Sequence, residues 1–206
     1  RVVEASIAVR RPDCPLILLT STLSLRPRFY NIAVSESLVR HVVEFEEGDL
    51  ERFLDASRGL LRVRVVDRRS GLLWVENPMP CSFCRALSSL KGLPLALNLD
   101  STGAPVYRVI MPSKTALTRL ISRLKANHLE PELLKAAGRP RIARLTRGQV
   151  RALIVAYEYG FFDYPKRVTL ERLAQILGVK PATLDETLRR AVKKLVEEYL
   201  RQHLTI

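Results

Sequence analysis

The spacing of hydrophobic and polar positions divides the first two thirds of the chain into short strand-like and helix-like stretches. Near the start, short apolar runs predict strands at residues 2–9, 16–22 and 31–34. Further along, a strand, a helix, a hairpin and a second helix are expected at residues 39–45, 48–59, 61–76 and 81–90. A second hairpin is expected at residues 95–111. The region therefore alternates the two kinds of element.

A longer amphipathic helix is expected after the second hairpin. Ser113 can cap its first turn, and the apolar positions Leu117, Leu120, Ile121 and Leu124 fall on one face. Strand, helix, hairpin, helix and strand is the order of a ferredoxin-like sandwich. The fold class is thus expected to be α+β, with residues 1–138 forming an N-terminal sensory or interaction domain of that type, although a fold alone does not specify function.

The last third predicts helices only. Thr146 and Gln149 have the spacing of a capping box, so a helix should begin there, and Gly160 should end it. Its apolar positions Val150, Leu153, Ile154 and Tyr157 share one face. After a loop at residues 161–168, Thr169 is a suitable N-cap for a second helix, whose repeat of apolar positions is Leu170, Leu173, Ala174 and Leu177.

A third helix is expected to begin at Pro181, because Gly178 ends the second helix after about nine residues. Two helices joined by such a short turn form a helix-turn-helix unit. The apolar stripe of the third helix, expected to be buried, is Leu184, Leu188, Val192, Leu195 and Tyr199. The opposite face carries Thr183, Glu186, Arg190, Lys193 and Glu197, flanked by Ala182, Arg189 and Lys194.

Charge separates the two regions further. The chain of 206 residues has a formal net charge of +13, which favours a phosphate backbone or an anionic membrane as a partner. Residues 139–206 hold 14 basic and 7 acidic side chains, against 20 and 14 in residues 1–138. The basic, proline-containing stretch 138–141 predicts a linker between the two domains. The uncharged run 14–25 has 12 residues; because a membrane-spanning helix needs about 20, no membrane segment is expected. The three cysteines are too few and too unevenly spaced for a disulfide scaffold and suit a reducing compartment, so a cytoplasmic location is expected.

Four stretches of the last third resemble a known family. They are Leu145-Thr-Arg-Gly-Gln, Ala156-Tyr-Glu-Tyr-Gly-Phe-Phe-Asp-Tyr-Pro-Lys-Arg, Leu173-Ala-Gln-Ile-Leu-Gly-Val and Thr183-Leu-Asp-Glu-Thr-Leu-Arg-Arg-Ala. Together, over about residues 144–200, they resemble the C-terminal helix-turn-helix of archaeal bacterio-opsin-activator-like transcription regulators. The resemblance implies a DNA-binding transcription regulator with a sensory region ahead of it. The chain differs from the family at Lys180, where Ser is usual, and at Thr187, where His is common.

The third helix is expected to enter the major groove of double-stranded DNA. The residues expected to contact DNA are Lys180, Ala182, Thr183, Glu186, Thr187, Arg189, Arg190, Lys193, Lys166 and Arg167. Arg190 can bond a guanine edge with two hydrogen bonds. Glu186 can accept a bond from cytosine or pair with Arg190 one turn away, and the sequence leaves both open. A homodimer through the long third helix and a contact with the basal transcription machinery are further hypotheses.

The motif Cys81-Ser-Phe-Cys84 supports an alternative function. A helix N-terminus favours a thiolate, so the pair could respond to redox state or hold a metal in a module that binds nucleic acid without sequence preference. Zinc usually takes four ligands, and no second pair at suitable spacing is present, although Cys14 could approach if the fold brought it there. No cofactor is expected. Phosphate loops, metalloprotease helices and nucleophile elbows are absent from the sequence, which disfavours an enzyme.

Overall fold

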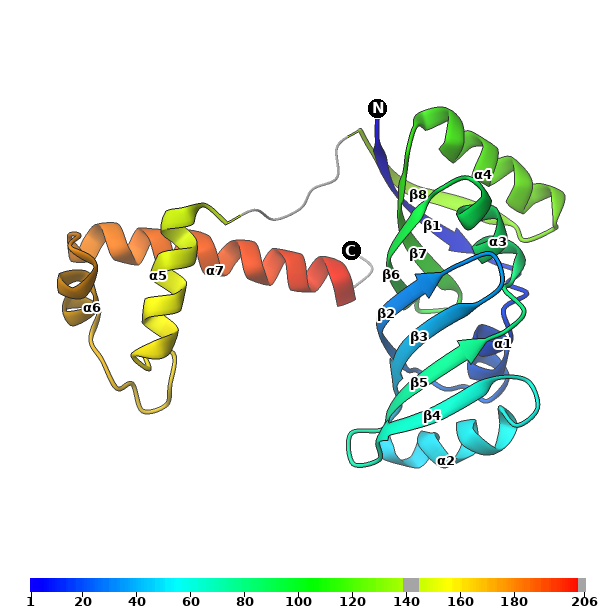
Figure 1. The fold of residues 1–206 in the computed structure, drawn as a ribbon, viewed down its shortest axis with the longest axis horizontal. Helices are drawn as coiled ribbons and strands as arrows, with labels where there is room; N and C mark the ends of the chain where they lie inside the picture. The colour runs from blue at the N-terminus through cyan, green and yellow to red at the C-terminus, as the bar shows by residue number, and fades with distance from the viewer. Residues whose placement is uncertain (139–144, 204–206) are drawn as a thin grey trace. The chain divides into compact units, whose positions relative to one another are not determined.

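The computed structural model describes residues 1–138 and 145–203, which divide into an N-terminal and a C-terminal compact unit. Most of the predicted linker, residues 139–141, lies outside the described residues. The N-terminal unit contains β1 to β8 and α1 to α4, and the C-terminal unit contains α5 to α7 (Figure 1).

The N-terminal unit contains two antiparallel sheets of four strands, in the orders β6-β7-β1-β8 and β2-β3-β5-β4. Its elements are β1 (Val3–Val9), α1 (Pro15–Thr22), β2 (Arg28–Val34), β3 (Val39–Glu44), α2 (Glu47–Ala56), β4 (Arg62–Asp67), β5 (Leu72–Asn77), α3 (Ser82–Ser89), β6 (Leu93–Leu99), β7 (Pro105–Met111), α4 (Lys114–Ala126) and β8 (Pro131–Ala137). The edge strands β2 and β6 contact each other, and Figure 1 shows α1 to α4 on one side of the sheets.

The order strand, helix, two strands, helix, strand occurs twice along this unit. The first repeat runs from β1 to β4, and the second runs from β5 to β8. In the sheets, however, β1 pairs with β7 and β8 of the second repeat, whereas β5 pairs with β3 and β4 of the first. The two repeats have therefore exchanged their first strands. The α+β class is confirmed, but the ferredoxin-like order occurs twice instead of once.

Two elements differ from the expectation. Residues 16–22 belong to α1 and not to a strand; Pro15 stands at its first turn, and Leu16, Ile17 and Thr20 are buried. A run of eight apolar and hydroxyl residues is too short for periodicity to distinguish helix from strand. The strand β8 was not expected, because it begins with a proline and its side chains are mostly exposed. Both features are typical of the edge strand that it is.

Alternate residues of the central strands face one common core. In β1 these are Val3, Ala5, Ile7 and Val9, and in β5 they are Leu73 and Val75. Two stacked pairs of rings lie in the same core: Phe45 on Phe53, with centroids 4.3 Å apart, and Phe83 on Tyr107, 3.7 Å apart. The core is thus continuous across both sheets, since it includes residues from each.

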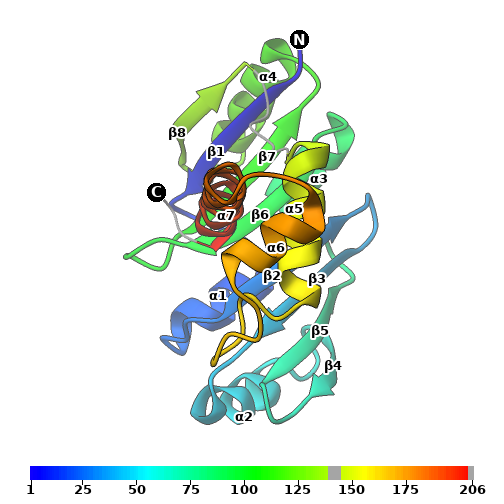
Figure 2. The ribbon, with the colours of Figure 1, turned by 90° about the vertical axis from the view of Figure 1, so that its left-hand side faces the viewer.

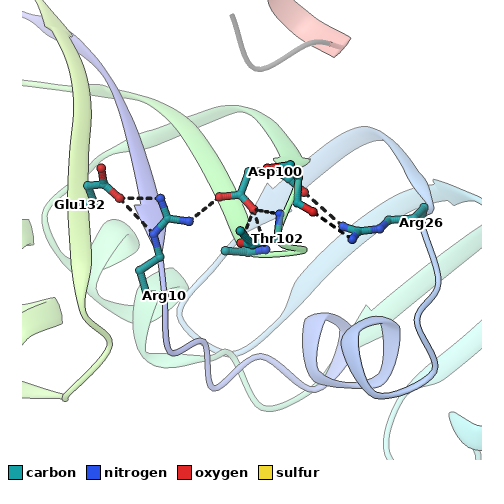
Figure 3. A network of polar contacts seen from close by, with 7 residues as sticks. Arg10, Arg26, Asp100, Thr102 and Glu132 are labelled. Atoms are coloured by element: carbon teal, nitrogen blue, oxygen red, sulfur yellow. Dashed lines mark hydrogen bonds and ion pairs between the residues drawn. The ribbon is translucent and has the colours of Figure 1, made fainter.

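A polar network joins the ends of β1, β8 and the β6–β7 turn (Figure 3). Arg10 pairs with Glu132, to which its Nε donates at 3.0 Å, and with Asp100. Asp100 also accepts bonds from the amides of Thr102 and Ala104, at 2.9 and 3.0 Å, while Arg26 donates to its carbonyl at 3.1 Å. Burial acts to raise the pKa of Asp100, but the bonds from Thr102 and Arg10 outweigh it and lower the pKa.

The C-terminal unit contains α5 (Arg147–Glu158), α6 (Leu170–Leu177) and α7 (Pro181–His203); Figure 2 looks along α7. The predicted caps are confirmed: Thr146 and Gln149 form the capping box, and the Thr169 hydroxyl accepts from the Arg172 amide. A small core joins the three helices and contains Ala152, Ala156, Leu173, Ala174, Leu184 and Leu188.

The apolar stripe of α7 is only partly buried, which corrects the expectation. Leu184 and Leu188 are buried, but Val192, Leu195 and Tyr199 are 36%, 47% and 61% exposed. In α5 the apolar face is also open, because Val150, Ile154 and Tyr157 are exposed while Ala152 and Ala156 are buried. Amphipathic spacing indicates that a face is apolar, but it does not supply a partner to cover it.

Candidate nucleic-acid interface

The turn between α6 and α7 fixes how the two helices meet. Gly178 adopts a left-handed conformation with φ of 70°, and the amide of Val179 donates to the Ala174 carbonyl at 3.0 Å. This conformation disfavours residues with a side chain, which explains the glycine. The helix-turn-helix predicted from the sequence is therefore present, with α7 as its second helix.

The first turn of α7 is open to an anion. The Lys180 carbonyl accepts from the Leu184 amide at 3.1 Å, which makes Lys180 the residue that begins the helix. A lysine side chain offers no acceptor for the amides of the first turn, and Pro181 has no amide hydrogen. Lys180, Ala182 and Thr183 are all exposed. Amides of this kind, beside a cation, suit a phosphate oxygen.

The exposed side of α7, called the reading face here, comprises Ala182, Thr183, Glu186, Arg189, Arg190 and Lys193. Its cations pair with acids one turn earlier or later along the helix. Nη2 of Arg190 lies 2.5 Å from Oε1 of Glu186. Nε of Arg189 lies 2.8 Å from Oδ2 of Asp185. Lys193 lies 3.8 Å from Glu197. Of the two hypotheses for Glu186, the pair with Arg190 is the one that forms in the chain without DNA.

Thr187 is held by the helix itself. Its hydroxyl donates to the Thr183 carbonyl at 2.7 Å, and the residue is half-buried. Such a bond back to the preceding turn is common for threonine in helices. The hydroxyl oxygen can still accept a bond, so a contact between Thr187 and DNA stays a prediction.

Lys166 and Arg167 lie in the loop between α5 and α6. The Lys166 ammonium lies 4.4 Å from the centre of the Phe161 ring, a cation–π contact. The Arg167 Nε donates to Asp163 at 2.5 Å. A methyl group on Gly160, where φ is +74°, would lie 2.5 Å from that Nε, so glycine permits the contact. Both cations are exposed and held in place by the loop, and their contact with DNA stays a prediction.

The cysteine pair lies in the N-terminal unit. Cys81 is the N-cap of α3, and Cys84 lies in its first turn. Both thiols are buried, and Cys14 and His41 are buried beside them. Within residues 1–138 and 145–203, no three or more His, Cys, Asp or Glu side chains are arranged to hold a metal ion. Sequence reasoning left Cys14 open and missed His41, because only the fold brings them to the pair.

Comparison with known proteins supports the helix-turn-helix. Residues 145–197 match a family model described as "HTH DNA binding domain". A protein of Haloferax volcanii named "Putative transcriptional regulator" is 40% identical over 57 residues. That stretch covers 28% of this chain and 10% of the relative. The resemblance to bacterio-opsin-activator-like regulators over this segment is thereby confirmed, and the helix-turn-helix of the C-terminal unit is similar to DNA-binding domains of that class.

Among the described residues, no helix is long and apolar enough to cross a membrane.

Proposed function

We propose that the chain regulates transcription by inserting the first turns of α7 into the major groove of double-stranded DNA. The observation that carries this proposal is the exposed, cation-rich reading face on the second helix of a unit that matches a DNA-binding family. Arg190 and Thr183 are the proposed base contacts. The proposed phosphate contacts come from two places. One is Lys180 together with the first amides of α7, and the other is the loop that holds Lys166 and Arg167.

Binding in this way exchanges partners on the reading face. Arg190 must give up part of its pair with Glu186, at 2.5 Å in the free chain, when it reaches a guanine. Since both side chains are more than half exposed, this pair contributes little to the free energy of unfolding, and breaking it costs little on binding. Glu186 is then available to a cytosine amino group. The pair therefore supports readout of neighbouring bases.

The N-terminal unit is the proposed regulatory domain. Because the proposed partner is double-stranded DNA, the proposed location is the cytoplasm.

The exposed apolar residues of α7 support a protein partner as well. They lie about 160° around the helix from Thr183, Glu186 and Arg190, and they are Val192, Leu195, Val196 and Tyr199. A groove of about 570 Å³ lies beside them, lined in part by Phe162 and Val192. A second copy is the proposed partner, because operators are often palindromic.

Selection of binding sites from a randomised duplex pool tests the DNA-binding proposal. We expect the intact chain to enrich one motif and Arg190→Ala to lose about 1–3 kcal/mol of discrimination at one base pair. The matched control is Lys135→Ala, which removes one exposed charge from β8 in the N-terminal unit. It should keep the motif.

Equal, motif-free binding by all three proteins, with a steep fall as salt rises, would overturn base readout and leave charge alone as the cause. That result would favour the alternative module that uses Cys81 and Cys84 with non-specific nucleic-acid binding. Sedimentation at micromolar concentration tests the dimer separately, and a mass of one chain would contradict it. Capture of a general transcription factor in place of a second copy would favour the basal machinery as partner.

A further inference from the structure

The exchange of first strands brings two equivalent turns of the N-terminal unit together. Cys14 follows β1 and is the N-cap of α1, and Cys81 follows β5 and is the N-cap of α3. The two turns are joined by a bond that crosses between the repeats: the Ser82 amide donates to both carboxylate oxygens of Asp13, at 3.0 and 3.1 Å. The same position of each repeat therefore holds a thiol, and the fold places the two thiols side by side.

A third thiol and an imidazole complete the cluster. Cys14, Cys81 and Cys84 are 4%, 5% and 2% exposed. The thiols of Cys14 and Cys84 donate hydrogen bonds to the Cys81 sulfur, which lowers the pKa of Cys81 and, together with burial, raises the pKa of both donors. His41 is buried beside them, and its Nδ1 has no hydrogen-bond partner among the residues that the structure describes. Burial lowers the pKa of His41 to about 4, so the ring is neutral near pH 7.

We propose that Cys81 and Cys14 form an oxidation site for small hydroperoxides, at which the product is a disulfide between the two repeats. The Cys81 sulfur attacks one peroxide oxygen, the O–O bond breaks, and the other oxygen leaves with a proton as water or alcohol. The Cys14 sulfur then attacks the sulfenic sulfur of Cys81. The S–O bond breaks, and the hydroxyl group leaves as water with the Cys14 proton. Two thiols have lost two electrons, and one peroxide has gained them.

The assignment of roles follows from the hydrogen bonds. Cys81 accepts from both neighbours, so it has the most thiolate character of the three and is the attacking sulfur. Cys14 holds the equivalent N-cap position in the other repeat, and the bond between Asp13 and Ser82 holds the two turns together, so Cys14 is the sulfur placed to resolve the sulfenic acid. The burial of all three thiols restricts the oxidant to a small molecule.

Peptide mapping of the full chain after treatment with hydrogen peroxide tests the proposal. The remaining thiols are blocked by an alkylating reagent before digestion. We expect a cross-linked peptide that joins Cys14 to Cys81, with Cys84 alkylated. Cys84→Ala should retain the cross-link, and the matched variant Cys14→Ala should lose it and leave Cys81 as a sulfenic acid that a dimedone probe captures.

Three results would overturn the proposal. They are full alkylation of all three thiols after peroxide treatment, a disulfide between Cys81 and Cys84 only, and stoichiometric zinc in chain purified without chelators, which would make the thiols metal ligands. The first two results come from mapping of the unaltered chain and the third from metal analysis of the same chain, so each is obtained even where a variant fails to fold. The site lies wholly in the N-terminal unit, so its failure leaves the proposed DNA binding untouched.

Discussion

The N-terminal and C-terminal units differ in how completely they bury their apolar residues. The N-terminal unit encloses a core that extends across two sheets and includes stacked aromatic pairs. The C-terminal unit has a small core around Leu173, Leu184 and Leu188 and leaves the apolar faces of α5 and α7 open. One unit is thus built to be stable by itself. The other presents apolar and cationic surface that suits partners.

The largest loss of stability is expected from a substitution in the N-terminal core, and it should affect that unit alone. Phe53 is fully buried and stacks on Phe45, so Phe53→Ala should reduce the free energy of unfolding of the N-terminal unit by about 3–5 kcal/mol. Differential scanning calorimetry of the full chain measures it. The transition of the C-terminal unit should stay in place. A shift of both transitions together would contradict the separation of the two units.

Acid should also destabilise the N-terminal unit selectively. His41 has a pKa of about 4 in the fold and about 6.5 when unfolded, so between these values the unfolded chain binds more protons. Stability therefore falls as the pH drops from 6.5 to 4, by up to about 3 kcal/mol for this group. Urea unfolding of the chain and of His41→Leu at pH 7 and 4.5 measures the difference.

The exposed histidine supplies the matched control for that experiment. His128 is exposed and has φ of 57°, a conformation that asparagine tolerates. His128→Asn should leave the acid loss unchanged, whereas His41→Leu should reduce it. Equal acid loss in all three proteins would assign the effect to the carboxylates.

A smaller effect is expected at the turn of the helix-turn-helix. Gly178→Ala should destabilise the C-terminal unit by about 1–2 kcal/mol, because a methyl group there meets no atom of the described residues within 4 Å and the cost is conformational alone. Gly178→Asn should cost less, since asparagine adopts this conformation more readily. Thermal unfolding followed by circular dichroism compares the two. Equal loss in both variants would indicate a steric cause.

The smallest effect on stability is expected from the open stripe of α7. Leu195 is 47% exposed, so Leu195→Ser should change the free energy of unfolding of a single chain by no more than about 0.5 kcal/mol. The same substitution should weaken self-association in sedimentation experiments if a second copy covers the stripe. The comparison for stability is Leu188→Ser, which makes the same change at a buried position of the helix and should unfold the unit.

Local signals in the sequence were sufficient for the C-terminal helices. Thr146, Thr169 and Gly178 act on amides or dihedral angles within three residues of themselves, and each does so in the structure. The contacts between Lys166 and Phe161, and between Arg167 and Asp163, needed the loop conformation to be known. The sequence therefore predicted the helices and caps of the candidate interface better than the contacts between its side chains.

Long-range pairing is what the sequence could not specify. Both β1 and β5 have alternating apolar residues that suit the centre of either sheet, and only the fold shows which repeat each strand completes. Reading residues 16–22 as a strand also hid the first repeat, because that repeat needs α1 as its first helix. The approach of Cys14 to Cys81 depends on that exchange, so the C-x-x-C motif alone indicated a pair where the fold holds three thiols.

The exchanged strands make the two repeats a single folding unit. Each sheet has its own first strand replaced by that of the other repeat, so each sheet is built from strands on both sides of the β4–β5 turn. Two copies of a polypeptide holding one repeat could pair in the same way by exchanging their first strands. The tandem chain thus has the strand pairing of a domain-swapped dimer within one polypeptide.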